Sequence, residues 1–245
     1  MSKDYIHDIT TKHLNKSYFD DVDYRGILEI SSLITLGQLW TGSPEGPEGK
    51  RHTDKLVKHS YLLFYEFLFM YLFQNNFTSR ESKMNILEIG VEKGGSLGLW
   101  RDFFYNSKIF GLDYREFDCD NRAIKKFEDR KVSISIFDST DSEKVENEYE
   151  DEFFDIIIDD GSHVPEDQIS TFKNFYNKLK PGGLYIVEDI VDVESGKRIY
   201  QGMRSISSTL GVALIDLSGV ISRPDDIIIL ACKFDENRKN ISNDV

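Results

Sequence analysis

The sequence predicts an α/β domain in which helices cover both faces of a mostly parallel, seven-stranded sheet, a doubly wound arrangement. From residue 85 onward, short apolar runs alternate with amphipathic stretches, which is the order expected of parallel strands joined by crossover helices. The last two apolar runs are separated only by residues 218–226, which are too few for a crossover helix. We therefore expect the last strand to be antiparallel.

The individual elements follow from the period of the apolar residues. Seven strands are expected where apolar residues form short runs, at Ile86–Ile89, Lys108–Leu112, Val132–Phe137, Phe154–Ile158, Leu184–Val187, Val212–Leu217 and Ile227–Cys232. Helices are expected in the amphipathic stretches between them, at Ser96–Phe104, Asn121–Glu128, Ser142–Glu148, Glu166–Leu179 and Ser195–Thr209.

The chain before the sheet divides into two parts. Residues 1–52 show no clear period and are expected to form an N-terminal extension or lid; within it, Leu28–Leu39 is a helix or strand, and 41–49 is a loop rich in glycine and proline. A helical lead-in is expected at 53–76, and within it an aromatic helix is predicted over Lys55–Gln74. The main domain then spans 53–245, with the sheet core at 85–234 and a polar tail at 235–245.

Composition limits the possible partners. The chain has 245 residues, 30 of them basic and 43 acidic, and a formal net charge of -13, which argues against a nucleic-acid partner. Cys119 and Cys232 are too few for a disulfide framework and are typical of a reducing compartment. No signal-peptide pattern follows Met1, and the apolar stretch Tyr61–Phe73 is too short to cross a bilayer. These features predict a cytoplasmic protein without a membrane partner.

A glycine-rich turn follows the first predicted strand. Glu88 lies within that strand, and the turn Gly90-Val91-Glu92-Lys93-Gly94-Gly95-Ser96 opens a helix, where backbone can approach a ligand. The spacing lacks the second glycine of a pyrophosphate-binding turn, so it favours a cofactor without phosphates. Asp113 ends the second strand and can accept hydrogen bonds from ribose hydroxyls. Asp138-Ser139 follows the third strand and either contacts an adenine edge or caps the next helix.

Carboxylates end two further strands. Asp159-Asp160 is followed by Gly161-Ser162-His163, and Glu188-Asp189 ends the next strand. Asp160, Glu188 and Asp189 are hard oxygen ligands suited to Mg²⁺, Mn²⁺ or Ca²⁺, and converging carboxylates repel one another without a cation. The alternative is that Asp159 or Asp160 caps the following turn and that Glu188-Asp189 faces solvent. His163, with an ordinary pKa of about 6.5, is the candidate general base. His59, with Asp54, Tyr61, Tyr65 and Glu66, either lines an entrance or packs in the core.

Together these motifs resemble the class I S-adenosylmethionine-dependent methyltransferases, which have a Rossmann-like fold. The resemblance covers about residues 50–233 and includes Leu179-Lys180-Pro181-Gly182-Gly183. More narrowly, the chain resembles the metal-dependent sugar O-methyltransferases that tailor macrolide sugars. The motifs that carry this resemblance are Asp160-Gly161-Ser162-His163, Glu188-Asp189 and the upstream Thr53-Asp54-Lys55 and His59-Ser60-Tyr61.

The resemblance implies an activity and a set of roles. The expected reaction is methyl transfer from S-adenosylmethionine to a sugar hydroxyl, assisted by Mg²⁺ (or Mn²⁺), with His163 as general base and Asp160 beside it. Asp160, Glu188 and Asp189 would hold the metal. The cofactor would be held by Glu88, Gly90, Gly94, Ser96, Asp113, Asp138, Ser139 and Asp159. A homo-oligomer and a small sugar-containing substrate are also expected.

Three other functions fit parts of the pattern. A catechol-type O-methyltransferase would use similar metal chemistry on a phenolic diol. A nicotinamide-dependent oxidoreductase is disfavoured by the glycine spacing. A cofactor-binding module without catalysis would need neither the acidic cluster nor His163.

Overall fold

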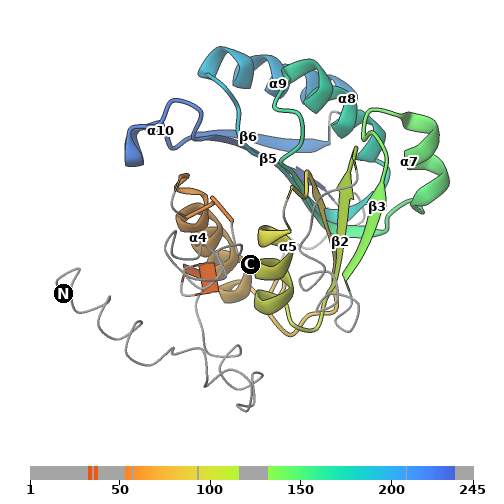
Figure 1. Ribbon diagram of the computed structural model, residues 1–245, viewed down its shortest axis with the longest axis horizontal. Coiled ribbons are helices and arrows are strands. Elements are labelled where there is room, and N and C mark those ends of the chain that lie inside the picture. Colours follow the sequence, from red (N-terminus) through yellow and green to blue (C-terminus); the bar gives the residue numbers. More distant parts are fainter. Residues whose placement is uncertain are drawn as a thin grey trace, which may run out of the picture.

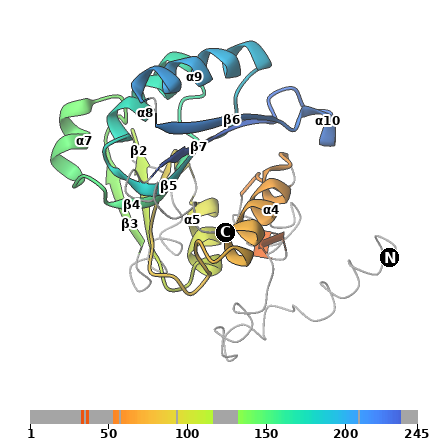
Figure 2. The ribbon, with the colours of Figure 1, turned by 180° about the vertical axis from the view of Figure 1, so that it is seen from behind.

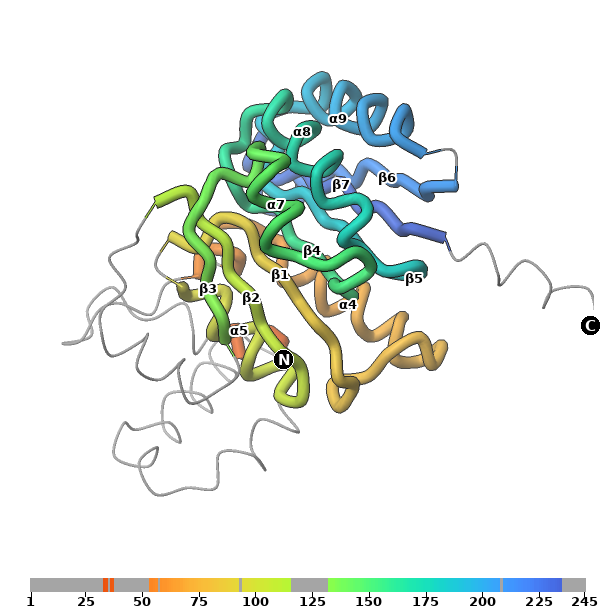
Figure 3. The backbone as a smooth tube through the Cα atoms, turned by 90° about the vertical axis from the view of Figure 1, so that its right-hand side faces the viewer, coloured from red at the N-terminus to blue at the C-terminus, as the bar shows by residue number. Residues whose placement is uncertain are grey.

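One seven-stranded sheet organises the molecule (Figure 1). The computed structural model describes residues 33–34, 36–37, 53–56, 58–92, 94–115, 132–207 and 209–234. Its strands are β1 (Asn85–Ile89), β2 (Lys108–Asp113), β3 (Val132–Ile136), β4 (Phe154–Asp159), β5 (Leu179–Val187), β6 (Leu210–Asp216) and β7 (Ile227–Lys233). Their order is β3-β2-β1-β4-β5-β7-β6, as the tube view shows (Figure 3). The first five strands pair in parallel, whereas β7 runs antiparallel to both β5 and β6, so the predicted antiparallel last strand is confirmed.

Helices cover both faces of the sheet (Figures 1 and 2). On one side lie α4 (Tyr61–Gln74) and α5 (Gly95–Phe103), and on the other lie α7 (Ser142–Glu148), α8 (Pro165–Phe175) and α9 (Val193–Ile206). The four-residue helix α10 (Ser218–Ile221) lies in the short link before β7.

Each face has its own apolar core because side chains along a strand alternate between the two faces. On β4, Ile156 and Ile158 belong to the core under α4 and α5, and Ile157 belongs to the core under α7, α8 and α9. This double burial explains why the strands read as continuous apolar runs. The doubly wound fold predicted from the sequence is therefore correct.

Three predicted helices have boundaries that are wrong by two residues or more. The helix expected to continue to Leu179 ends at Phe175, because Leu179 already pairs with Phe154 as the start of β5. The helix expected at Ser195–Thr209 begins two residues earlier and ends at Ile206, since Asp192 accepts a hydrogen bond from the Ser195 N–H at 2.7 Å as its cap. The helix expected from Lys55 begins only at Tyr61.

Several predictions concern residues outside the described part of the chain. These are the helix at 121–128, the loop at 41–49, the tail at 235–245, Cys119, and most of the N-terminal extension with His7, His13 and His52. Within the predicted element at 28–39, residues 33, 34, 36 and 37 are described and are helical.

The aromatic helix α4 packs one side on the core and exposes the other. Tyr61, Tyr65 and Phe69 are buried, whereas Phe67 and Tyr71 are exposed. The exposed side agrees with a homo-oligomer, which stays a prediction. Among the described residues, none of the helices combines the length and apolar character needed to cross a membrane.

Candidate active site

The acidic residues converge because three neighbouring strands end in register. Ile89 of β1 is opposite Asp159 of β4, which is opposite Val187 of β5. Hydrogen bonds extend this alignment beyond the strands, from Asp160 N to Ile89 O at 2.8 Å and from Glu188 N to Asp159 O at 2.9 Å. Gly90, Asp160 and Glu188 therefore come together at the carboxyl edge of the sheet, where ligands bind in this fold class.

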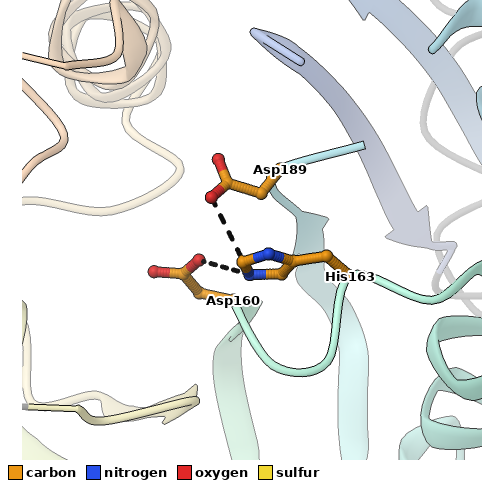
Figure 4. A group of neighbouring side chains, drawn as sticks. All are labelled: Asp160, His163 and Asp189. Atoms are coloured by element: carbon orange, nitrogen blue, oxygen red, sulfur yellow. Dashed lines mark ion pairs between the residues drawn. The ribbon is translucent and has the colours of Figure 1, made fainter. Parts of the chain in front are cut away.

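His163 lies over this edge, between two of the carboxylates (Figure 4). Its Nε2 lies 3.4 Å from Asp160 Oδ1 and 3.8 Å from Asp189 Oδ2. Both His163 and Asp189 have positive φ angles, 58° and 52°. Left-handed backbone in residues other than glycine is strained and is concentrated at functional sites. The loop and the end of β5 are thus held in unusual conformations that point these side chains at one another.

A buried lysine lies on the inner side of the cluster, which we define as the side away from His163; the side that faces His163 is the outer side. Lys55, whose side chain is fully buried, places Nζ 2.7 Å from Asp160 Oδ2, 3.4 Å from Glu88 Oε1, and in contact with Glu188 Oε2. The Tyr65 hydroxyl donates to Glu188 Oε1 at 2.5 Å. Both oxygens of Glu188 are therefore engaged by the segment that precedes the sheet.

The charges of these groups are interdependent. Burial opposes ionisation of Asp160, but the nearby Lys55 and His163 bring its pKa below the ordinary value. Burial raises the pKa of Asp189, and the negative charge of Asp160 raises it further. The contact with Asp160 raises the pKa of His163 to about 9, although burial acts against this, and Asp189 adds to the effect. The imidazole and Lys55 thus balance the carboxylates in the metal-free protein.

The outer side of the cluster fits a hard divalent cation. One ligand atom each from Asp160, His163 and Asp189 lie within 4.8 Å of one another. His163 Nε2 is buried and makes no hydrogen bond within the protein, as expected of a group that serves a ligand or substrate. Carboxylate oxygens suit Mg²⁺ or Mn²⁺. Glu188 does not join this group of ligand atoms, so its predicted metal role stays a prediction.

The predicted cofactor residues of the first loop lie at the same edge. Glu88 is buried beneath Lys55, and burial raises its pKa to about 7. Gly94 is the left-handed cap of α5, and Ser96 Oγ lies 3.3 Å from Thr53 Oγ1. At Gly90, with φ +89°, a Cβ atom would lie 1.9 Å from the Asp160 carbonyl oxygen. This close approach explains the glycine without a ligand.

The other predicted cofactor residues are engaged with the protein itself. Asp113 Oδ2 accepts hydrogen bonds from the Val91 and Glu92 N–H groups, at 3.0 and 3.2 Å, which fixes the loop. Asp159, which is buried, accepts a hydrogen bond from the Tyr185 hydroxyl at 2.9 Å. A cofactor role for both stays a prediction.

Asp138 and Ser139 lie after β3, close to the start of α7. Asp138 is exposed and accepts from Thr140, whereas Asp141 is the cap of α7, so neither Asp138 nor Ser139 is the helix cap considered as their alternative role. Ser139 Oγ lies 2.9 Å from Thr171 Oγ1.

Sequence reasoning missed the part played by the segment before the sheet. Lys55 was noted as the start of a helix and as part of a resemblance. Tyr61 and His59 were noted as part of the same resemblance and as packing or entrance residues. In the structure the Tyr61 hydroxyl donates to Asp189 Oδ1 at 2.6 Å, and His59 Nδ1 lies 3.3 Å from the same oxygen. The available signal was a lysine and polar aromatic residues preceding an otherwise apolar helix.

The state of His163 predicts how stability depends on pH in the metal-free protein. Its folded-state pKa of about 9 exceeds the ordinary value of 6.5, so its contribution is complete below pH 6.5 and is lost as the pH rises towards 9. Thermal unfolding in EDTA should therefore show a larger loss between these values in wild type than in His163→Gln. The difference will be modest because the side chain is 38% exposed. Equal losses in both proteins would contradict the ion-pair arrangement.

Comparison with known proteins gives the class to which this fold belongs. No family model matches the sequence. The mycinamycin-pathway methyltransferase MycE, solved with Mg, SAH and mycinamycin VI, superimposes with a TM-score of 0.60 at 20% identity, covering 87% of this chain and 57% of MycE. That similarity establishes the fold: the chain has the Rossmann-like fold of the S-adenosylmethionine-dependent methyltransferases.

The curated sequence relatives point to a more specific class of enzyme than the fold does. Mycinamicin VI 2''-O-methyltransferase of Micromonospora griseorubida is 27% identical over 180 residues, 69% of this chain and 44% of the relative. A tetracenomycin rhamnosyl 3'-O-methyltransferase of Streptomyces olivaceus is 33% identical over 127 residues, 49% of this chain and 31% of the relative. The homologues are thus sugar O-methyltransferases, and the chain spans less than half the length of each of these two.

Proposed function

We propose that this chain catalyses methyl transfer from S-adenosylmethionine to a hydroxyl of a sugar-containing small molecule. The observation that carries the proposal is the convergence of Asp160 Oδ1 and Asp189 Oδ2 on His163 Nε2, at 3.4 and 3.8 Å, at the carboxyl edge of a methyltransferase sheet. The sugar acceptor is proposed from the relatives, which are O-methyltransferases of macrolide and tetracenomycin sugars.

The residues fit both groups that the reaction needs. Asp160 and Asp189 would hold a Mg²⁺ ion, with Glu188 beside them, and the bound ion would acidify an acceptor hydroxyl. The first loop, with Glu88 and Asp113, would hold S-adenosylmethionine, which supplies the methyl group on its sulfonium. MycE was solved with Mg and SAH, the demethylated form of this cofactor, which supports the same pair here.

The chain's own residues would remove the proton of the acceptor hydroxyl and orient that hydroxyl towards the methyl group. An alcohol is a weak nucleophile until its proton leaves, and His163 Nε2 is the acceptor that the site offers for it. In the metal-free structure, the two carboxylates hold the imidazole at this edge of the sheet through their ion pairs. Holding the hydroxyl in line with the sulfonium then supplies much of the remaining acceleration.

A comparison of donors and acceptors tests the proposal. We expect SAH to raise the melting temperature of the protein and NAD to leave it unchanged, because the first loop lacks a pyrophosphate-binding turn. With S-adenosylmethionine and Mg²⁺, a panel of glycosylated polyketides and nucleotide sugars should include a methylated product, detected by a mass increase of one methylene.

The alternatives give different results in the same assay. Methylation of catechols, with the sugars left unchanged, would favour a catechol-type enzyme. Stabilisation by NAD rather than SAH would indicate an oxidoreductase. SAH binding without turnover on any acceptor would leave a binding module and contradict the proposed activity.

A further inference from the structure

The segment that precedes the sheet contacts the carboxylates of the site, among them Asp160 and Asp189. From here on, the lead-in means residues 53–65, the first part of the segment 53–76 that was expected to precede the sheet. Residue 57 within it is not described. The polar side chains of the lead-in contact helix α5 and the ends of three strands. Thr53 contacts Ser96 of α5, Lys55 contacts Glu88 and Asp160, and Tyr61 contacts Asp189. The lead-in is anchored there independently of these contacts, because the Ser60 N–H donates to the buried Asp226 carboxylate at 3.1 and 3.2 Å.

Lys55 holds one oxygen of Asp160. Its Nζ lies 2.7 Å from Asp160 Oδ2, while the other oxygen, Oδ1, faces His163. A fully buried ammonium among three carboxylates is a costly way to stabilise a fold, because the desolvation of each charge offsets much of the attraction. What the pair does fix is the orientation of the carboxylate.

Tyr61 holds one oxygen of Asp189 in the same manner. Its hydroxyl donates to Asp189 Oδ1 at 2.6 Å and accepts a hydrogen bond from the Asp189 N–H at 3.1 Å. One hydroxyl thus fixes both the side chain and the left-handed backbone of this residue, with φ +52°. His59 stacks on the Tyr61 ring with centroids 4.6 Å apart and lies 3.3 Å from the same carboxylate oxygen.

We propose that Lys55 and Tyr61 are positioning residues. Lys55 holds Oδ2 of Asp160 and Tyr61 holds Oδ1 of Asp189, so that the other oxygen of each carboxylate is directed at one cation beside His163. This inference rests on the proposed function, since it assigns the outer oxygens to the metal. The lead-in is then part of the active site, although it contributes no atom to the group of ligand atoms.

Substitution of Tyr61 by phenylalanine is the sharpest test, because it removes one oxygen atom and leaves the ring packed. The probe is Mn²⁺, measured by electron paramagnetic resonance without cofactor or acceptor; SAH affinity is measured separately in EDTA. Tyr149→Phe is the matched control, because Tyr149 is buried in the core on the opposite face of the sheet.

We expect Tyr61→Phe to bind Mn²⁺ about tenfold more weakly than wild type, the usual consequence of losing a hydrogen bond that orients a ligand. Its SAH affinity should stay within about twofold of wild type, because the lost oxygen contacts Asp189 and not the first loop. With saturating Mn²⁺, the loss should lie in kcat rather than in the KM for S-adenosylmethionine. The Tyr149→Phe control should match wild type in every measurement.

The possible Mn²⁺-binding results separate this inference from the proposed function. Unchanged Mn²⁺ affinity in folded Tyr61→Phe, with wild type binding Mn²⁺, overturns the inference and leaves the proposed function intact. Wild type that binds no Mn²⁺ overturns both. If Tyr61→Phe does not fold, Lys55→Met, which removes the other proposed positioning contact, takes its place. An Mn²⁺ affinity equal to that of wild type would again overturn the inference.

Discussion

Replacing His163 by alanine should lower the rate of methyl transfer by roughly 10²- to 10⁴-fold, the usual contribution of a general base, and leave SAH affinity near that of wild type. Nε2 is the basic atom that faces both outer carboxylate oxygens, at 3.4 and 3.8 Å, and it makes no hydrogen bond within the protein. In the metal-free protein these carboxylates hold it as imidazolium. When their charge is neutralised, that stabilisation is lost and Nε2 can accept a proton.

The measurement is single-turnover methyl transfer at saturating S-adenosylmethionine, which separates the chemical step from product release. His163→Gln, which keeps a polar side chain of similar reach, should be as slow as His163→Ala. Wild-type rates in either variant would remove the base assignment, whereas lost SAH binding would show that the loop had been displaced.

Removal of divalent cations should silence turnover, and Mg²⁺ or Mn²⁺ should restore it. Asp160 and Asp189 each offer a carboxylate oxygen on the side of His163. A cation bound there would lower the free energy of the alkoxide that forms when the acceptor hydroxyl loses its proton. Turnover is assayed after dialysis against EDTA and again after addition of each metal. SAH should still bind to the EDTA-treated protein, because the cofactor residues lie on the first loop.

Substitution of Asp160 and Asp189 tests whether these two carboxylates are responsible for the metal dependence. Asp160→Asn and Asp189→Asn should each lose Mg²⁺ activation, whereas Glu143→Gln, an exposed carboxylate in the first turn of α7, should behave as wild type. Full activity after exhaustive chelation would contradict a metal-assisted mechanism.

The sequence predicts the framework of this site well because the relevant information is local. The apolar runs define the strands, and in-register ends bring Gly90, Asp160 and Glu188 together once the strand order is known. The helix Ser142–Glu148 was predicted with its observed limits, although its cap is Asp141 rather than Asp138 or Ser139. The approach of His163 to Asp160 follows from a spacing of three residues.

The lead-in contacts could not be predicted because they join distant parts of the chain. Lys55 meets Asp160 across 105 residues, and Tyr61 meets Asp189 across 128. Periodicity gave Lys55 a place in a helix, but its charge is buried instead among three carboxylates, in a turn before α4. Likewise, the sequence could not show that a Cβ at Gly90 would collide with the backbone of Asp160; the cofactor role of Gly90 stays a prediction.

The proposed mechanism requires Asp160 and Asp189 each to direct one carboxylate oxygen at a single cation beside His163. The decisive experiment is a crystal of this protein grown with SAH and Mn²⁺ and measured at the manganese absorption edge. We expect one anomalous peak about 2.1–2.2 Å from an oxygen of each carboxylate, with His163 facing the open side of the ion. Absence of a peak there, or a peak bound at a different part of the chain, would contradict the account.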